Sequence, residues 1–166
     1  MTARSFDLAQ VNIALLREPL DSPLLADFVA ALAPVNALAD TSRGFVWRLQ
    51  TGDGDATAVR AFGDDRLIVN MSTWESIDAL ADFVYRSAHT DVMRQRRKWF
   101  QQLEQMYTVL WWVPAGHRPT VAQAEERLNL IRAHGPSPHA FTFRERSPPP
   151  GSDEALQARE DDYCLA

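Results

Sequence analysis

The sequence has little cysteine, no long apolar run and no recognisable metal-ligand spacing. Its one cysteine, Cys164, excludes an intramolecular disulfide. No stretch approaches the roughly 20 apolar residues that cross a bilayer, and the first residues carry no apolar segment of signal-peptide length. No pair of histidines, cysteines or carboxylates is spaced like metal ligands. We therefore expect a cytoplasmic protein with neither a membrane partner nor a bound metal.

Motifs and charge that would point to nucleotides or nucleic acids are also missing. The chain has no serine elbow, phosphate loop or dinucleotide fingerprint. Its 17 basic and 22 acidic residues give a net charge of −5, which predicts no nucleic-acid partner. One basic run, residues 94–98 with Trp99 after it, spreads over more than one helical face and is expected to be a solvated helix surface.

What the chain does have is the composition of one ordinary globular domain. Of its 166 residues, 46% are hydrophobic and 23% are charged, both typical values. From Ser147 the composition changes to three prolines, Gly151 and then mostly acidic and small residues. We predict a single domain over residues 1–146 and a disordered C-terminal tail over residues 147–166.

Periodicity and turn signals predict alternating strands and helices. Predicted strands cover residues 6–16, 45–50, 57–62, 66–73, 107–113 and a short edge at 140–143. Predicted helices cover residues 23–40, a segment after the capping-box spacing Ser72 to Glu75, residues 90–105, and a segment between Thr120 and Gly135. Pro34 is expected to kink or split the first helix.

This order of elements predicts an α+β fold, a ferredoxin-like antiparallel sheet with helices on one face. The other face of the sheet carries large apolar residues, and an exposed apolar face of several hundred Å² is unusual on a monomer. Either the sheet curls round a pocket or a second copy covers it. We favour both together, in a homodimer whose sheets enclose two lumens.

Several runs of the chain resemble the family of domain of unknown function 3291. They are Leu8–Ile13, Pro34–Asp40, Gly44–Leu49, Val69–Ser76, Phe83–His89, Trp99–Phe100 and Trp111–His117, and together they cover about residues 6–145. That family is similar in turn to the dimeric α+β-barrel superfamily, which includes antibiotic-biosynthesis monooxygenases, through the pattern of residues 69–89. The resemblance implies a dimeric α+β barrel and assigns no reaction, because such barrels host several chemistries.

Polar residues on the predicted strands are the first candidates for a site. Alternation places Gln10 with Asn12, Arg48 with Gln50, and Asn70 with Ser72, each pair on one strand face. If these faces coincide, they form either a satisfied structural network or the wall of a ligand site. We predict ligand-binding roles for Asn12, Trp47, Arg48, Asn70, Tyr85 and Trp112, although core or interface packing is the expected alternative for the tryptophans.

Two histidines are the candidates for catalysis. His89 follows the helix that ends near Arg86, and His117 lies in a turn after the last strand. Either could transfer a proton near neutral pH, and either could instead be a structural group. In the catalytic hypothesis, Arg48 and Asn70 orient an oxyanion or a carbonyl.

The function expected from these residues is binding of a small, largely apolar organic molecule. A reaction without a cofactor, like that of a monooxygenase or a cyclase, is the enzymatic form of this hypothesis. The alternatives are a non-catalytic binding or interaction module whose lumen is filled by its own side chains, and a haem-binding barrel with an axial histidine.

Overall fold

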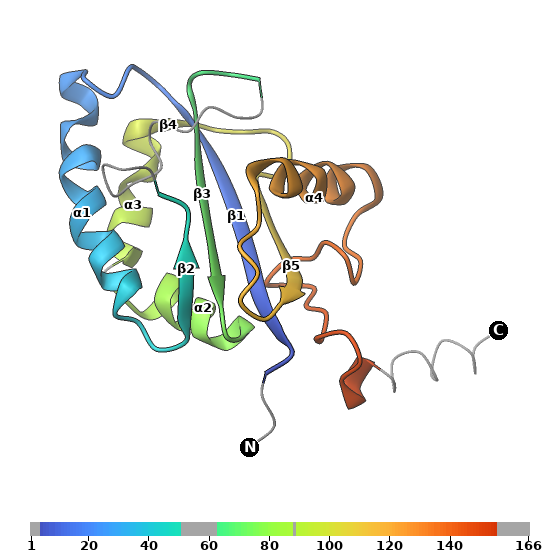
Figure 1. Cartoon of the computed structure of the whole chain (residues 1–166). Helices are drawn as coiled ribbons and strands as arrows, with labels where there is room; N and C mark the ends of the chain where they lie inside the picture. Colours follow the sequence, from blue (N-terminus) through green and yellow to red (C-terminus); the bar gives the residue numbers. More distant parts are fainter. Residues whose placement is uncertain (1–3, 51–62, 88, 156–166) are drawn as a thin grey trace.

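The computed structural model describes residues 4–50, 63–87 and 89–155, and it contains both helices and a sheet (Figure 1). The strands are β1 Phe6–Leu16, β2 Phe45–Arg48, β3 Leu67–Trp74, β4 Phe100–Gln101 and β5 Thr108–Pro114. The helices are the short 3-10 turn η1 Pro23–Leu25, then α1 Ala26–Asp40, α2 Ile77–Arg86, α3 His89–Trp99 and α4 Val121–His134. The strand predicted at 57–62 lies outside the described residues.

The sheet has the strand order of a ferredoxin-like fold. β1 lies at the centre, with β3 and then β2 on one side and β5 on the other. Every pairing between the described strands is antiparallel, and β4 pairs with the last two residues of β1. The predicted α+β class and antiparallel sheet are confirmed.

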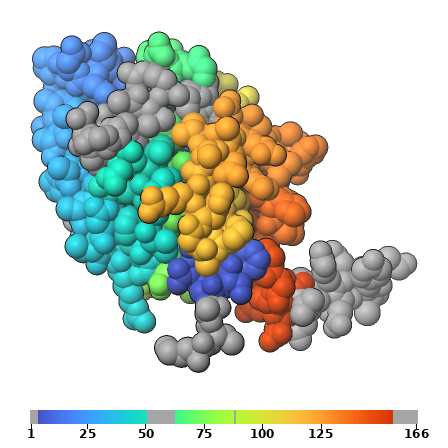
Figure 2. Space-filling model, viewed as in Figure 1, coloured from blue at the N-terminus to red at the C-terminus, as the bar shows by residue number. Residues whose placement is uncertain are grey.

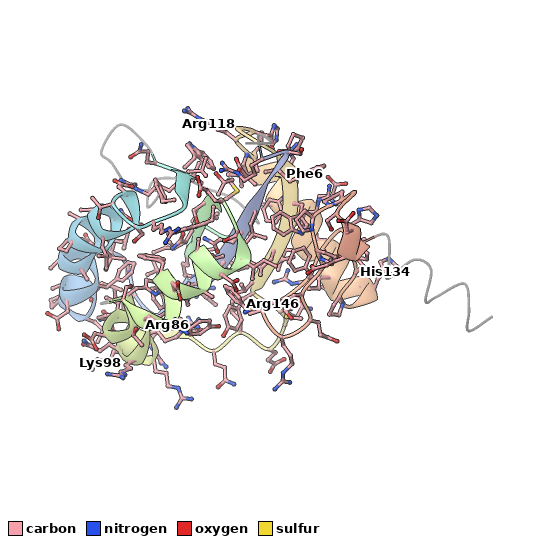
Figure 3. The ribbon with its side chains drawn as sticks, turned by 90° about the horizontal axis from the view of Figure 1, so that it is seen from below. Phe6, Arg86, Lys98, Arg118, His134 and Arg146 are labelled. Carbon is pink, nitrogen blue, oxygen red and sulfur yellow. The ribbon has the colours of Figure 1, made fainter. Side chains whose placement is uncertain are left out.

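The two faces of the sheet are covered by different helices. Helices α1, α2 and α3 lie on the face that carries Leu8, whereas α4 lies on the opposite face, where Leu128 packs against Val11 and its neighbours (Figure 1). In the same view, atoms of β2 in teal and of the segment from β5 to α4 in gold and orange lie at the front of the molecule (Figure 2). Seen from below, Arg86 and Lys98 lie on the side of α2 and α3, and Arg118 lies on the far side of the sheet (Figure 3).

This arrangement corrects the prediction that all helices share one face. Val11 and Val69 on the second face are already 0% exposed within one chain, because α4 and the neighbouring strands cover them. An uncovered sheet face therefore no longer argues for a dimer, and the homodimer stays a prediction.

The helix after β3 begins four residues later than predicted. Ser72 remains in β3, where it pairs with Gln10, so the capping box over residues 72–75 is wrong. Ser76 is the N-cap of α2, with extended backbone and a side chain that accepts a hydrogen bond from the Ala79 N–H. The capping box at Thr120 is confirmed and begins α4.

Pro34 does not split α1. The helix runs unbroken from Ala26 to Asp40. A proline removes one backbone donor and leaves the carbonyl of residue Ala30 without its helical partner. Ala30 and Pro34 are both exposed, so water can satisfy that carbonyl.

Two further segments differ from the prediction. The helix predicted to Gln105 ends at Trp99, since Phe100 joins the sheet as β4 beside the end of β1. The predicted edge strand at 140–143 is a single bridge, in which Phe141 exchanges two backbone hydrogen bonds with Leu110.

At the start of the predicted tail, the Trp112 indole donates to the Ser147 carbonyl at 2.8 Å. The predicted tail boundary stays a prediction.

The segment Pro23–Asp40 corrects the expectation that no stretch is long and apolar enough to cross a membrane, because it has a mean hydropathy of 1.3 over 18 residues. Helices that pack in a domain can pass the same test. Here Phe28 contacts the rings of Trp99 and Phe100, with centroids 5.5 and 5.0 Å away, which joins this helix to α3 and β4. That the protein has no membrane partner stays a prediction.

Candidate ligand-binding cavity

A cavity of about 500 Å³ lies between the sheet and helices α1–α3 of a single chain. This is within the range of small-molecule sites, about 300–1,000 Å³. Its helical wall is mostly apolar and includes Phe28, Leu32, Val35, Val84, Val92 and Met93. The cavity lies on the face that α1–α3 cover, and α4 covers the other face, so the prediction of a site on a helix-free side of the sheet is wrong. Its size also argues against a lumen filled by the protein's own side chains.

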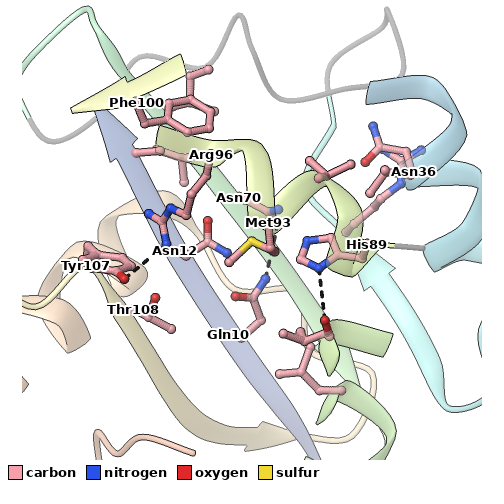
Figure 4. Close-up of a pocket in the computed structure, with 18 of the residues that line it drawn as sticks. Gln10, Asn12, Asn36, Asn70, His89, Met93, Arg96, Phe100, Tyr107 and Thr108 are labelled. Carbon is pink, nitrogen blue, oxygen red and sulfur yellow. Dashed lines mark hydrogen bonds between the residues drawn. The ribbon is translucent and has the colours of Figure 1, made fainter. Parts of the chain in front are cut away.

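The sheet wall of the cavity carries a row of polar side chains (Figure 4). Asn12 lies opposite Asn70 in the pairing of β1 with β3, and opposite Thr108 in the pairing of β1 with β5. Gln10 also lines the cavity, and its side-chain amide donates to the Ser72 hydroxyl at 3.0 Å and to the side-chain oxygen Oδ1 of Asn70 at 3.3 Å. The predicted coincidence of these strand faces is confirmed, and part of the row forms its own network.

Ser72 anchors that network behind the cavity wall. Its hydroxyl accepts hydrogen bonds from Gln10 and, at 2.9 Å, from the indole N–H of Trp74. All three side chains are buried. Gln10 is therefore held in one orientation, whereas the Asn12 side chain keeps its amide free of any hydrogen bond to the described residues.

His89 faces the cavity from the first turn of α3 (Figure 4). Its Nδ1 lies 3.5 Å from the Val84 carbonyl, and its ring packs on Phe83 with centroids 5.0 Å apart. Burial lowers the pKa of His89, and the Val84 carbonyl offsets this only in part, so the ring is neutral at pH 7. Because a carbonyl can only accept, the proton belongs on Nδ1 and the lone pair on Nε2.

Arg48 lines the cavity from the end of β2, as the strand alternation predicts. Its guanidinium forms a two-point ion pair with Asp40 at the end of α1, at 2.7 and 3.2 Å. The Arg48 side chain is only 14% exposed. Its charge is therefore already matched by a protein carboxylate.

Arg96 was assigned to a solvated basic run by the sequence, and the structure turns it into the cavity instead. Its Nη1 donates to the Tyr107 hydroxyl at 3.2 Å, and its guanidinium carbon lies 4.8 Å from the centre of the tyrosine ring (Figure 4). The signal was present, since His89, Val92 and Met93 precede Arg96 at spacings that share one helical face.

The other predicted site residues lie elsewhere. Trp47 packs with the cluster on the opposite face of the sheet, and Trp112 packs near Phe141. His117 is exposed beside α4, with Nε2 3.2 Å from the Gln123 side-chain oxygen. Tyr85 lines the cavity but is 60% exposed, which places it at the mouth. The cavity thus brings together Asn12, Arg48, Asn70, Tyr85 and His89, and leaves out Trp47, Trp112 and His117.

A metal centre finds no support in the part of the chain that the structure describes. No group of three or more histidine, cysteine, aspartate or glutamate side chains there could hold a metal ion.

Comparisons with known proteins give a family and no curated relative. The chain is similar to a crystal structure of a protein of unknown function from Nitrosomonas europaea, with 12% identity, a TM-score of 0.42, and coverage of 71% of this chain and 97% of that one. It is also similar to SnoaB, a cofactor-independent oxygenase from Streptomyces nogalater, with 16% identity, a TM-score of 0.42, and coverage of 69% and 96%. No curated protein matches. A family model described as domain of unknown function (DUF3291) matches residues 7–158, and the chain therefore belongs to that family.

Proposed function

We propose that the cavity binds a small, largely apolar organic molecule and that His89 exchanges a proton with it. One observation carries this proposal: a neutral histidine lies in the apolar helical wall of a cavity, and the sheet wall opposite carries a row of asparagine and glutamine side chains. Apolar walls bind the body of a ligand, and a few fixed polar groups orient it.

The chemistry of these groups suits removal of a proton from carbon or from a hydroxyl. The Nε2 lone pair of His89 accepts the proton, and has no hydrogen-bond partner among the described residues. The anion that results is stabilised by N–H donors fixed on the strands, Asn12 and Asn70. Strands hold such donors more rigidly than loops do, so little reorganisation accompanies the reaction.

An activated anion of this kind can react without a cofactor in two ways. As a carbanion, it can attack a carbonyl within the same molecule. The new carbon–carbon bond closes a ring, the carbonyl π bond opens to an alkoxide, and the alkoxide takes back the proton from His89. The anion can also reduce dioxygen, so that one oxygen atom enters the product as a carbonyl and the other leaves as water, with a methylene group of the substrate as the source of the electrons. We propose a reaction of one of these classes.

Oxygen uptake with an anthrone as probe tests the oxygenase form. We expect the wild-type protein to accelerate uptake and His89→Gln to abolish the acceleration with an unchanged circular dichroism spectrum. His117→Gln is the matched control, because His117 is exposed and outside the cavity, and it should retain full activity. Equal rates for wild type and His89→Gln would reject the role of His89.

Native mass spectrometry of the protein as purified tests the binding proposal and two open predictions together. A co-purified small molecule supports binding, and the mass of the assembly tests the predicted homodimer.

Haem addition tests the haem alternative. A Soret band that appears with the wild type and is lost in His89→Ala would replace the cofactor-free proposal with that alternative. We also keep the cytoplasm as the proposed location.

A further inference from the structure

We propose that the molecule bound in this cavity carries a carboxylate, which Arg96 and Tyr107 hold where β1 meets β5. This inference rests on the proposed function, since it names the class of ligand for the same cavity. It adds a recognition group that the proton-transfer chemistry at His89 does not require.

The charges around the cavity are the first argument. Among the described residues that line it there are three arginines, Arg48, Arg96 and Arg144, and no aspartate or glutamate. This contrasts with the whole chain, whose net charge is −5. Arg48 is matched by Asp40, and Arg144 is exposed, so water solvates its charge. Arg96 is half-buried, and no carboxylate of the described chain pairs with it.

The surroundings of Arg96 are the second argument. A guanidinium has five N–H donors in a planar fork, and among the described residues only the Tyr107 hydroxyl accepts from Arg96. Taking a charge partly out of water without a partner costs free energy, which an anionic ligand would offset. Contact with the tyrosine ring holds the side chain in place while leaving the remaining donors available.

Further donors lie around the same point. Because the Tyr107 hydroxyl accepts from Arg96, its own hydrogen is available to a ligand. The Tyr107 carbonyl accepts from the Ile13 N–H at 2.9 Å, which fixes Tyr107 beside Asn12 and its partner Thr108. The close-up shows Arg96 reaching from α3 toward Tyr107, Asn12 and Thr108 (Figure 4).

A carboxylate matches this set of groups. Its two oxygens accept several hydrogen bonds and pair with guanidinium in a two-point geometry. One unmatched guanidinium balances one negative charge, and the adjoining apolar walls would accept the rest of an organic acid. The ligand is therefore an apolar organic acid that places its carboxylate at Arg96.

A pair of fluorescent probes tests this inference without knowledge of the natural ligand. Anilinonaphthalene sulfonate and N-phenylnaphthylamine share one aromatic frame, and only the first is an anion. Binding of each is measured for wild type, Arg96→Gln and the matched control Arg144→Gln, whose arginine is exposed. Displacement of the anionic probe by naphthoate and by naphthamide then compares a carboxylate with its neutral analogue.

We expect the wild-type protein to bind the anionic probe at least tenfold more tightly than the neutral one, and naphthoate to displace it better than naphthamide. Arg96→Gln should remove most of that preference and leave the affinity for the neutral probe unchanged. Arg144→Gln should change the preference by no more than about twofold, as expected for an exposed charge. Arg96→Lys keeps the positive charge without the planar arrangement of N–H donors, so it should retain part of the preference for the anionic probe.

The outcomes separate the two proposals. If neither probe binds, the cavity proposal itself fails. The carboxylate inference is wrong, and the cavity proposal stands, if the neutral probe binds and wild type prefers neither the anionic probe nor naphthoate. The same conclusion follows if Arg96→Gln keeps the wild-type preference for the anion. If circular dichroism shows that Arg96→Gln is unfolded, Arg96→Lys replaces it. The preference for naphthoate over naphthamide, compared between wild type and Arg96→Lys, then decides the inference.

Discussion

Gly44, in the turn between α1 and β2, gives the sharpest test of how α2 is held against the sheet. Its φ is +79°, and its carbonyl accepts a 2.7 Å hydrogen bond from the Glu75 N–H just before α2. A Cβ at this position would lie 2.6 Å from the Cβ of Ala79. Gly44→Ala therefore combines an unfavourable backbone conformation with a collision between this turn and α2.

The magnitude follows from these two contributions. A left-handed backbone costs a residue other than glycine about 1–2 kcal/mol. Carbon atoms in contact normally lie about 3.5–4.0 Å apart, so the collision forces a shift of about 1 Å, and overpacking of this kind costs about 1–3 kcal/mol. We expect Gly44→Ala to lower the free energy of unfolding by about 2–5 kcal/mol, measured by urea denaturation.

Two further variants separate the contributions. Gly116→Ala has a similar φ of +80° with no atom within 4 Å of the added Cβ, so it should cost only about 1–2 kcal/mol. Ala79→Gly removes the colliding methyl, so Gly44→Ala should cost less in that background than alone. Equal costs for Gly44→Ala and Gly116→Ala, together with an additive double variant, would refute the close approach of the turn to α2.

Three other predictions follow from individual contacts. Ser72→Ala should cost about 2 kcal/mol in urea denaturation, because it leaves the buried Trp74 N–H without its acceptor. Ser76→Ala should cost about 1 kcal/mol as a lost N-cap. A smaller cost for Ser72→Ala than for Ser76→Ala would contradict the buried hydrogen bonds at Ser72, and no cost for Ser76→Ala would contradict the assigned cap. Burial lowers the pKa of His89, so the unfolded chain binds more protons than the folded chain below about pH 6.5. The free energy of unfolding of the wild type should therefore fall more between about pH 7.5 and pH 5 than that of His89→Gln. Equal losses for the two proteins would contradict this. Trp112→Phe should lose about 1 kcal/mol and speed proteolysis after Ser147, and unchanged cleavage rates would show that this hydrogen bond does not restrain the segment.

The sequence was enough to predict the central strands and the row of polar residues. Successive side chains of a strand point to opposite faces, which separates Gln10 and Asn12 from Val11, and a sheet whose two faces are both packed preserves that separation. The N-cap at Thr120 was also predicted correctly, since a capping box depends only on residues three apart.

The same local pattern at residues 72–75 was wrong, because a competing long-range contact decided it. Pairing of Ser72 and Trp74 with β1, and the hydrogen bonds that Ser72 accepts within the sheet, extend β3 past the predicted helix start. Local propensity is weak compared with a strand that has partners along its whole length.

The sequence by itself therefore determined which side chains share a strand face, because that depends only on the alternation of neighbouring residues. Only the tertiary structure decided which helices cover each face, since α4 packs on one side and α1–α3 on the other. It also decided that Arg96 and His89 from α3 meet the strand amides across one cavity. Those contacts join residues distant along the chain, and they form only when the helices pack on the sheet and exclude water between them.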